Sequence, residues 1–155
     1  ANQVEEGGGL FACGDITGKL RSRDSVDYHI PDTIKSIKGN PKYDIVRCKK
    51  GEWWHMPSAE EWKELLNSAI VVQTTYKGVS GYKIIGTNGC AIFLPRNGFR
   101  DGEKEFYRNS YGLYWSSDVS KLPNCNEYLY MDKDFQMIDS FPRWRGMSIR
   151  PVREY

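Results

Sequence analysis

The amino-acid sequence predicts an α+β protein in which one helix packs on an antiparallel sheet. The first observation is a helical pattern over residues 58–69, and the second is a change to short β-rich segments after residue 80. The third is length, because 155 residues are enough for one hydrophobic core and short for two. The sequence therefore predicts a single domain, residues 1–155, with long loops.

The helix is expected from Ser58 to Ala69. Ser58 suits the N-cap position, and Glu61, three residues later, completes a capping box. Apolar residues then recur at the spacing of one helix face: Trp62, Leu65, Leu66 and Ala69. His55 directly precedes the helix, where packing at the helix entry is favoured over catalysis.

Short β-rich segments are expected to form the sheet. Residues 82–85 and 90–94 flank Asn88-Gly89, a turn pair typical of β-hairpins. Further strands are expected at residues 10–13, 113–117, 127–132, 135–138 and 146–152. The rest of the first 51 residues lacks a sustained period and is expected to form long loops.

Composition excludes several functional classes. The net charge is +2 and no block of Lys or Arg is present, which argues against a nucleic-acid partner. No run of eighteen apolar residues could span a membrane. The four cysteines lie at least 35 residues apart, so CxxC redox chemistry and zinc knuckles are excluded. Disulfides and buried reduced cysteines both remain open.

A cluster of aspartates raises the question of calcium. Asp132, Asp134 and Asp139 lie close together, but an EF-hand loop beginning at Asp132 needs Gly and Glu where Met137 and Arg143 stand. A polar hairpin tip is the simpler interpretation, and an irregular structural calcium site is the alternative. We expect no other cofactor.

The last third of the chain has the composition of a recognition surface. Tyr, Trp, Ser, Asn and Arg combine rigid rings with adaptable hydrogen bonds, and sugars stack on such rings. Trp62 and Trp115 are expected in the core. The candidate ligand-binding residues are Asp118, Asn124, Asn126, Tyr128, Tyr130, Asp132, Arg143, Trp144 and Arg145. For Tyr128, Tyr130, Trp144 and its adjacent arginines, binding and packing are equally supported.

Five sequence segments, taken together and in order, resemble one known family. They are EEGGGLFACGD, WWHMPSAEEWKELL, GTNGCAIFLPRNGFRDG, GLYWSSD and GMSIRPVRE, and they span essentially the entire chain. They resemble the Fibrobacter succinogenes major paralogous domain, which occurs in secreted and surface lipoproteins and adhesins. That family is related to formylglycine-generating sulfatase-modifying domains. The resemblance implies a C-type-lectin-like fold, with a helix on a twisted antiparallel sheet and binding surface in the loops.

The resemblance also implies a function. It suggests a non-enzymatic, extracellular or cell-surface recognition module that binds carbohydrate or a surface protein. The cysteine pair of formylglycine-generating enzymes and the EPN, QPD and WND motifs of calcium-dependent lectins are absent. A protein-receptor adhesin or a retroelement-diversified variable protein on the same fold is the alternative. Cys13 stands where relatives commonly have tryptophan, and residues 1–3 look like the middle of an opening segment, so we expect an N-terminally trimmed chain.

Overall fold

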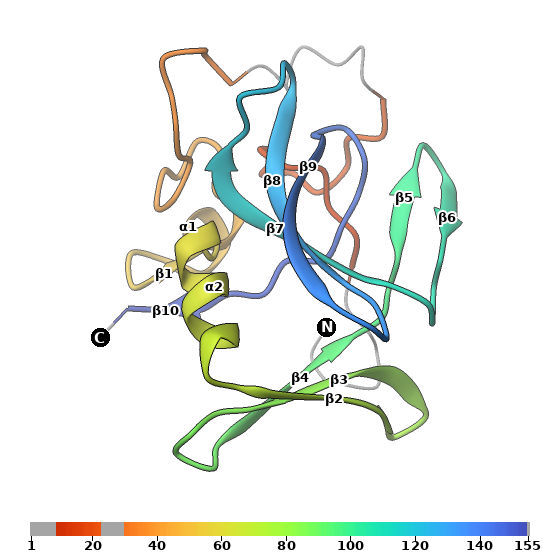
Figure 1. Ribbon diagram of the computed structural model, residues 1–155. Coiled ribbons are helices and arrows are strands. Elements are labelled where there is room, and N and C mark those ends of the chain that lie inside the picture. Colours follow the sequence, from red (N-terminus) through yellow and green to blue (C-terminus); the bar gives the residue numbers. More distant parts are fainter. Residues whose placement is uncertain (1–8, 23–29, 155) are drawn as a thin grey trace.

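The computed structural model describes residues 9–22 and 30–154. In this part of the chain, two short α-helices accompany ten β-strands, and the strands pair antiparallel in four small sheets (Figure 1). The molecule is thus mostly antiparallel sheet with a small helical part, in agreement with the expected α+β class. None of the described helices is long and apolar enough to cross a membrane.

The elements follow one another in a simple order. The first three are helix α1 (Ile45–Lys50), strand β1 (Trp54–His55) and helix α2 (Ala59–Asn67). The later strands are β2 (Ile70–Tyr76), β3 (Val79–Ile85), β4 (Ala91–Pro95), β5 (Phe99–Asp101), β6 (Lys104–Phe106), β7 (Gly112–Val119), β8 (Cys125–Met131), β9 (Gln136–Pro142) and β10 (Val152–Arg153). Strands β2-β3-β4 and β7-β8-β9 form the two larger sheets, while β5-β6 and β1-β10 form pairs.

The predicted capping box of α2 is confirmed. The hydroxyl of Ser58 accepts the amide of Glu61 at 3.1 Å, and the Glu61 carboxylate accepts the amide of Ser58 at 3.1 Å. The helix ends at Asn67, two residues earlier than expected. His55 is buried at the helix entry, with its ring nitrogens 3.0 Å from Glu61 and 3.0 Å from Glu154, which supports the packing role.

The central sheet, β7-β8-β9, carries a hydrophobic core on each face. Trp115 and Tyr128 belong to the core on one face, whereas Tyr114 and Leu129 belong to the core on the other, where Trp62 of α2 packs. Successive residues of a strand point to opposite faces, so this alternation follows from strand geometry. Trp62 and Trp115 are 2% and 0% exposed, which confirms both as core residues.

Other expectations were partly wrong. The predicted hairpin is confirmed as β3 and β4, which pair in register Tyr82↔Leu94, but β2 adds a strand that was not expected. Residues 45–50, expected in a loop, form α1 because the Asp44 carboxylate caps its first amides.

Two of the predicted strands, at residues 10–13 and 146–152, are shorter than expected. Residues 146–152 pair only through single bridges at Gly146, Met147 and Ser148 before β10, and residues 10–13 pair only at Phe11. Residues 1–3, on which the expectation of trimming rests, lie outside the described residues.

Candidate functional site

Alternation along β8 places its candidate tyrosines on one face of the central sheet. Tyr128 and Tyr130 point to one face of the central sheet, and Leu129 and Met131 point to the other. The β5-β6 hairpin stands beside β9 (Figure 1), and the Phe99 ring of β5 is 5.2 Å from the Phe141 ring of β9. Two segments that are distant in sequence therefore build one surface.

This surface is a continuous series of aromatic rings, which we call the aromatic face. Its neighbouring ring centroids are 4.9–6.0 Å apart, within the usual range for edge or offset contacts. The series consists of Phe106, Phe99, Phe141, Tyr107, Tyr111, Tyr130 and Phe135. Three of the rings are widely open to solvent, since Phe106 is 40%, Tyr107 55% and Phe135 49% exposed. The aromatic face therefore offers flat apolar area to a ligand.

Tyr107, the most exposed ring of the aromatic face, lies in the turn after β6, where the backbone is constrained. Tyr107 and Asn109 have φ angles of 59° and 67°, in the left-handed region that most residues avoid. The turn is fixed by hydrogen bonds from the Asn109 amide to the Arg96 carbonyl (2.7 Å) and from the Gly98 amide to the Tyr111 carbonyl (2.9 Å). Strain of this kind, about 1 kcal/mol for each residue, is concentrated at functional sites in proteins.

Arg145 supplies a cation to the aromatic face. Its guanidinium lies 4.7 Å from the Phe141 ring centroid and 5.7 Å from that of Phe99. The Nε atom is buried, is 3.7 Å from the Asp101 carboxylate and has no hydrogen-bond partner in the described structure. Because the Nε atom is buried, a ligand hydroxyl or carboxylate can meet only the remaining, 29% exposed part of the Arg145 side chain.

The Asp132 carboxylate is occupied by its own hairpin tip. One oxygen accepts the amides of Asp134 (2.7 Å) and Phe135 (3.0 Å), and the other accepts the Tyr130 hydroxyl at 2.9 Å. The hydrogen bonds from the two backbone amides lower the pKa of Asp132. Burial and the hydrogen bond to Asp132 raise the pKa of Tyr130. Within the described residues, no group of three or more His, Cys, Asp or Glu side chains is placed to hold a metal ion.

Tyr128 lies beneath the aromatic face rather than on it. Its side chain is 6% exposed and packs between the rings of Trp115 (6.4 Å) and Phe141 (5.4 Å). Burial, with a smaller contribution from the Asp139 charge, raises the Tyr128 pKa to about 12. The sequence supported packing and ligand binding equally for Tyr128, and its burial favours packing.

Four other candidate residues gather at the opposite end of β8. Asn126 is fully buried, donates to the Ser116 carbonyl (3.2 Å) and accepts Nε of Arg143 (2.8 Å), which is itself buried. Asp118 accepts the Ala59 amide at 2.7 Å, at the start of α2. Asn124 is exposed in a tight turn with φ of 57°. We expected ligand contacts from Asn126 and Arg143, but their burial removes both from the accessible surface.

Trp144 is the remaining candidate, and it adjoins Arg145 in the sequence. Trp144 is partly buried and its ring lies 5.8 Å from the Arg145 guanidinium. Of the candidates, Tyr130 thus belongs to the aromatic face, Asp132 accepts its hydroxyl, and Arg145 stacks on Phe141 and Phe99 at the other end of β9.

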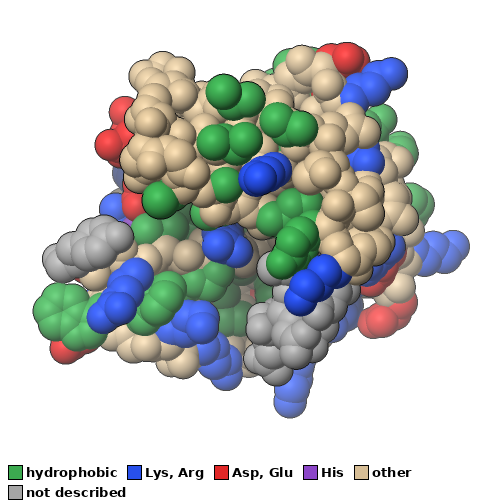
Figure 2. Space-filling view, turned by 90° about the horizontal axis from the view of Figure 1, so that it is seen from below, with side chains coloured by type: hydrophobic (Ala, Val, Ile, Leu, Met, Phe, Trp, Pro, Cys, Tyr) green, Lys and Arg blue, Asp and Glu red, His purple; other side chains and the backbone are tan. Residues whose placement is uncertain are grey.

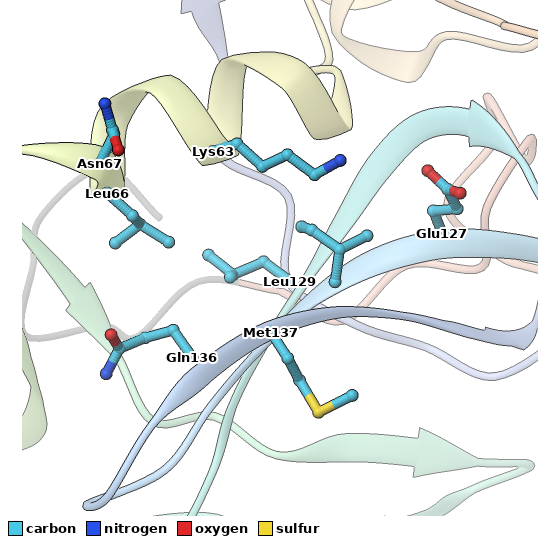
Figure 3. A pocket seen from close by; sticks show the side chains of 8 residues that line it. Lys63, Leu66, Asn67, Glu127, Leu129, Gln136 and Met137 are labelled. Carbon is cyan, nitrogen blue, oxygen red and sulfur yellow. The ribbon is translucent and has the colours of Figure 1, made fainter.

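A groove of ≈ 610 Å³ lies on the other face of the sheet, between α2, β8 and β9. Leu66, Leu129 and Ile138 give it an apolar floor, and Lys63 and Glu127 point toward one another across it (Figure 3). No aromatic ring and none of the candidate residues lines this groove. The aromatic face is therefore the site that better fits the chemistry expected from the sequence.

No protein-family model, curated protein or solved structure matches this chain. Its function is therefore inferred from the aromatic face and from the sequence resemblance.

Sequence reasoning missed most of the rings of the aromatic face. Phe99, Phe106, Tyr107 and Tyr111 fall in residues 99–111, which contain four rings in thirteen positions around Gly102. That density was the available signal. What it could not show is that the β5-β6 hairpin packs beside β8 and β9, because this pairing is set by tertiary contacts.

Proposed function

We propose that this chain is a non-enzymatic recognition module that binds carbohydrate through the aromatic face. The observation that carries the proposal is the row of partly exposed rings with the guanidinium of Arg145, whose side chain is 29% exposed, beside it. The CH faces of a sugar ring stack on such aromatic groups, and its hydroxyls pair with charged or amide side chains. The rings are fixed by contacts with one another, which limits the entropy lost on binding.

The chemistry around the rings supports a saccharide with several free hydroxyls. Asp101 beside Arg145 is 45% exposed at its side chain, so it is open to hydrogen bonds from the same ligand. Arg108 pairs with Glu105 of β6 at 2.8 Å, and these two residues flank the exposed Phe106 and Tyr107 in the sequence.

The scaffold is proposed to be C-type-lectin-like, of the Fibrobacter succinogenes major paralogous domain type. Support comes from the five ordered sequence segments and from the capped helix beside antiparallel sheets. On this proposal the protein acts outside the cell or attached to its surface, without an enzymatic reaction or a nucleic-acid partner. The ligand is then a glycan presented on another surface.

The experiment is a glycan-array screen of the purified protein, run with calcium and again with chelator. The test variant is Tyr107→Asn, because Asn tolerates the left-handed φ of 59° and removes the ring without disturbing the turn. The matched control is Leu122→Ala, which removes a 57% exposed apolar side chain that belongs to no ring contact. We expect specific binding in the wild type and the control, and at least a tenfold loss in Tyr107→Asn.

The alternative ligand is a protein receptor, on the same surface. The exposed rings of Phe106 and Tyr107 also suit a protein interface, since Tyr and Phe are enriched there. A blank array, together with receptor binding that Tyr107→Asn abolishes, would replace carbohydrate by protein as the ligand. Loss of signal in chelator would assign calcium a part in binding. Binding that is unaffected by Tyr107→Asn and Arg145→Ala would refute the aromatic face as the site.

A further inference from the structure

The outer face of the β2-β3-β4 sheet is apolar. Tyr82, Ile84 and Leu94 are 1%, 1% and 0% exposed, so the alternate residues of the three strands point outward. The register places the outward residues in adjacent rows, which we call the sheet face: Ile70, Val72, Tyr76, Val79, Lys83, Ile85 and Phe93. Ile70, Val72 and Tyr76 are 63%, 41% and 47% exposed.

Charge on the sheet is of one sign. Residues 70–96 contain three cations, Lys77, Lys83 and Arg96, and no Asp or Glu. Lys83 stands on the middle strand, between Val72 and Phe93 of its neighbours. Figure 2 shows hydrophobic and basic side chains together on the side of the molecule where this sheet lies, with acidic side chains only toward its margins. Apolar surface of this kind marks an interaction site.

An occupant of the sheet face must therefore be apolar and carry a carboxylate. Covering Lys83 without an acidic partner costs desolvation that nothing offsets. Two sheet faces packed against each other would bring two Lys83 ammonium groups together, so a symmetric pairing of this face with itself is disfavoured.

The described chain itself presents a surface with the required chemistry. Residues 132–139, the turn after β8 with the first half of β9, form an acidic tip that contains three Asp and one Lys. Phe135 and Met137 in this tip are 49% and 40% exposed. The tip cannot reach the sheet face of its own molecule, because Met131 at its base accepts the hydroxyl of Tyr82 (3.4 Å), which belongs to the inner side of that sheet.

We propose that the acidic tip of one copy docks on the sheet face of a second copy. Phe135 and Met137 contact Ile70, Val72 and Tyr76, and Asp134 pairs with Lys83. Such a contact joins two different surfaces, so each bound copy leaves one tip and one sheet face free, and further copies can add in the same way.

The size of the sheet face sets the strength of this assembly. Two strands of seven residues and one of five cover roughly 300 Å². A stable protein interface buries about 800 Å² on each partner. The association is therefore weak and reversible, and it should be measured at protein concentrations up to several hundred micromolar.

The test is sedimentation equilibrium on wild type and two variants. Lys83→Glu disables the sheet face, and the double variant Asp134→Lys/Met137→Ser disables the tip without removing a ring of the aromatic face. We expect the wild-type average mass to rise continuously beyond the dimer, while each variant alone remains monomeric. An equimolar mixture of the two variants should form a dimer and stop there, because only one intact tip and one intact sheet face can meet.

Matched controls and contrary outcomes make the result decisive. Lys121→Glu repeats the charge change, and Leu122→Ser the loss of an exposed apolar side chain, in a loop away from both surfaces, so both should associate like the wild type. A wild type that stays monomeric throughout would overturn the proposal, as would a mixture that stays monomeric although the wild type associates. None of these variants alters Tyr107 or Arg145, so failure here is separable from failure of the proposed function.

Discussion

Arg145 stacks on Phe141, with its Cζ atom 4.7 Å from the ring centroid. The same guanidinium faces Phe99 at 5.7 Å and lies beside Asp101 of β5. One side chain therefore joins the β5-β6 hairpin to β9. Because the aromatic face exists only while these two parts are held together, Arg145 supports the surface as well as contributing to it.

Arg145→Lys is the first prediction. Lysine keeps the charge but cannot stack a planar group on two rings, so we expect a loss of about 1 kcal/mol in the free energy of unfolding. The measurement is urea unfolding at constant pH and salt. Arg108→Lys, at an exposed ion pair with Glu105, is the control and should change stability by less than ~0.5 kcal/mol. Equal decreases in the free energy of unfolding of the two variants would show that the contacts of Arg145 with the rings add no stability.

Gly98 and Gly102 provide a matched pair for the second prediction. Both have a left-handed backbone, with φ of 64° and 61°, but a Cβ at Gly98 would lie 1.8 Å from the Phe106 carbonyl, whereas one at Gly102 meets nothing. Gly102→Ala should therefore cost only about 1 kcal/mol of conformational strain. Gly98→Ala should cost at least ~3 kcal/mol or abolish folding, because backbone must move. Thermal unfolding of both variants decides the matter, and similar melting temperatures would contradict it.

Local patterns allowed some elements to be predicted and not others. The capping box of Ser58 and Glu61 and the Asn88-Gly89 turn are encoded within a few residues, so the sequence predicts both, and both are confirmed. The segment 146–152 has strand-like composition, but it lies against Phe11, Arg100 and Tyr114 through single bridges. Which partners a short segment meets is a property of the whole fold.

The candidate site shows the same limit. Tyr128 and Tyr130 were grouped because they are close in sequence, and alternation along β8 does put them on one face. The solvent exposure of each tyrosine on that face depends on which other side chains cover its ring. Phe141 and Trp115 enclose Tyr128, whereas Tyr130 lies partly open beside Tyr111. The sequence around residue 128 does not indicate that Trp115 and Phe141 pack against this ring, because both are distant in the sequence.

Asn126→Ala is the third prediction. The side chain satisfies the buried Ser116 carbonyl and the buried guanidinium of Arg143, so its loss leaves polar groups unpaired. We expect a decrease of about 3 kcal/mol in the free energy of unfolding. Asn124→Gly is the control, because glycine accepts its φ of 57° and the side chain is exposed, so it should remain within ~0.5 kcal/mol of wild type. Binding to the aromatic face should survive in the folded fraction of both variants.

Thiol reactivity is the fourth prediction. All four cysteines are free: Cys48 and Cys90 are exposed, Cys125 is partly exposed and Cys13 is buried. Burial raises the pKa of Cys13 to about 12, so it carries almost no thiolate at pH 8. A colorimetric thiol reagent should titrate two groups rapidly, Cys125 more slowly and Cys13 only after unfolding. Fewer than four reactive thiols in denaturant would show a disulfide instead.

The pH dependence of Glu61 is the fifth prediction. Burial alone raises the pKa of its carboxyl, but hydrogen bonds from His55, Lys38 and the Ser58 amide outweigh burial and lower the pKa from 4.5 to about 2. A carboxyl whose pKa is lower in the folded state stabilises the fold above its unfolded pKa. That contribution is lost as the pH falls from about 4.5 toward about 2.

Glu61→Gln isolates this contribution, because glutamine keeps the capping-box hydrogen bond and removes the charge. Unfolding free energies of the variant and the wild type should differ most at pH 6 and converge as the pH approaches 2. Glu64→Gln, an exposed acid on the same helix, is the control and should follow the wild-type curve. A difference between Glu61→Gln and wild type that stays constant from pH 6 to pH 2 would show that the carboxylate charge contributes nothing, and that shape alone holds α2 against His55.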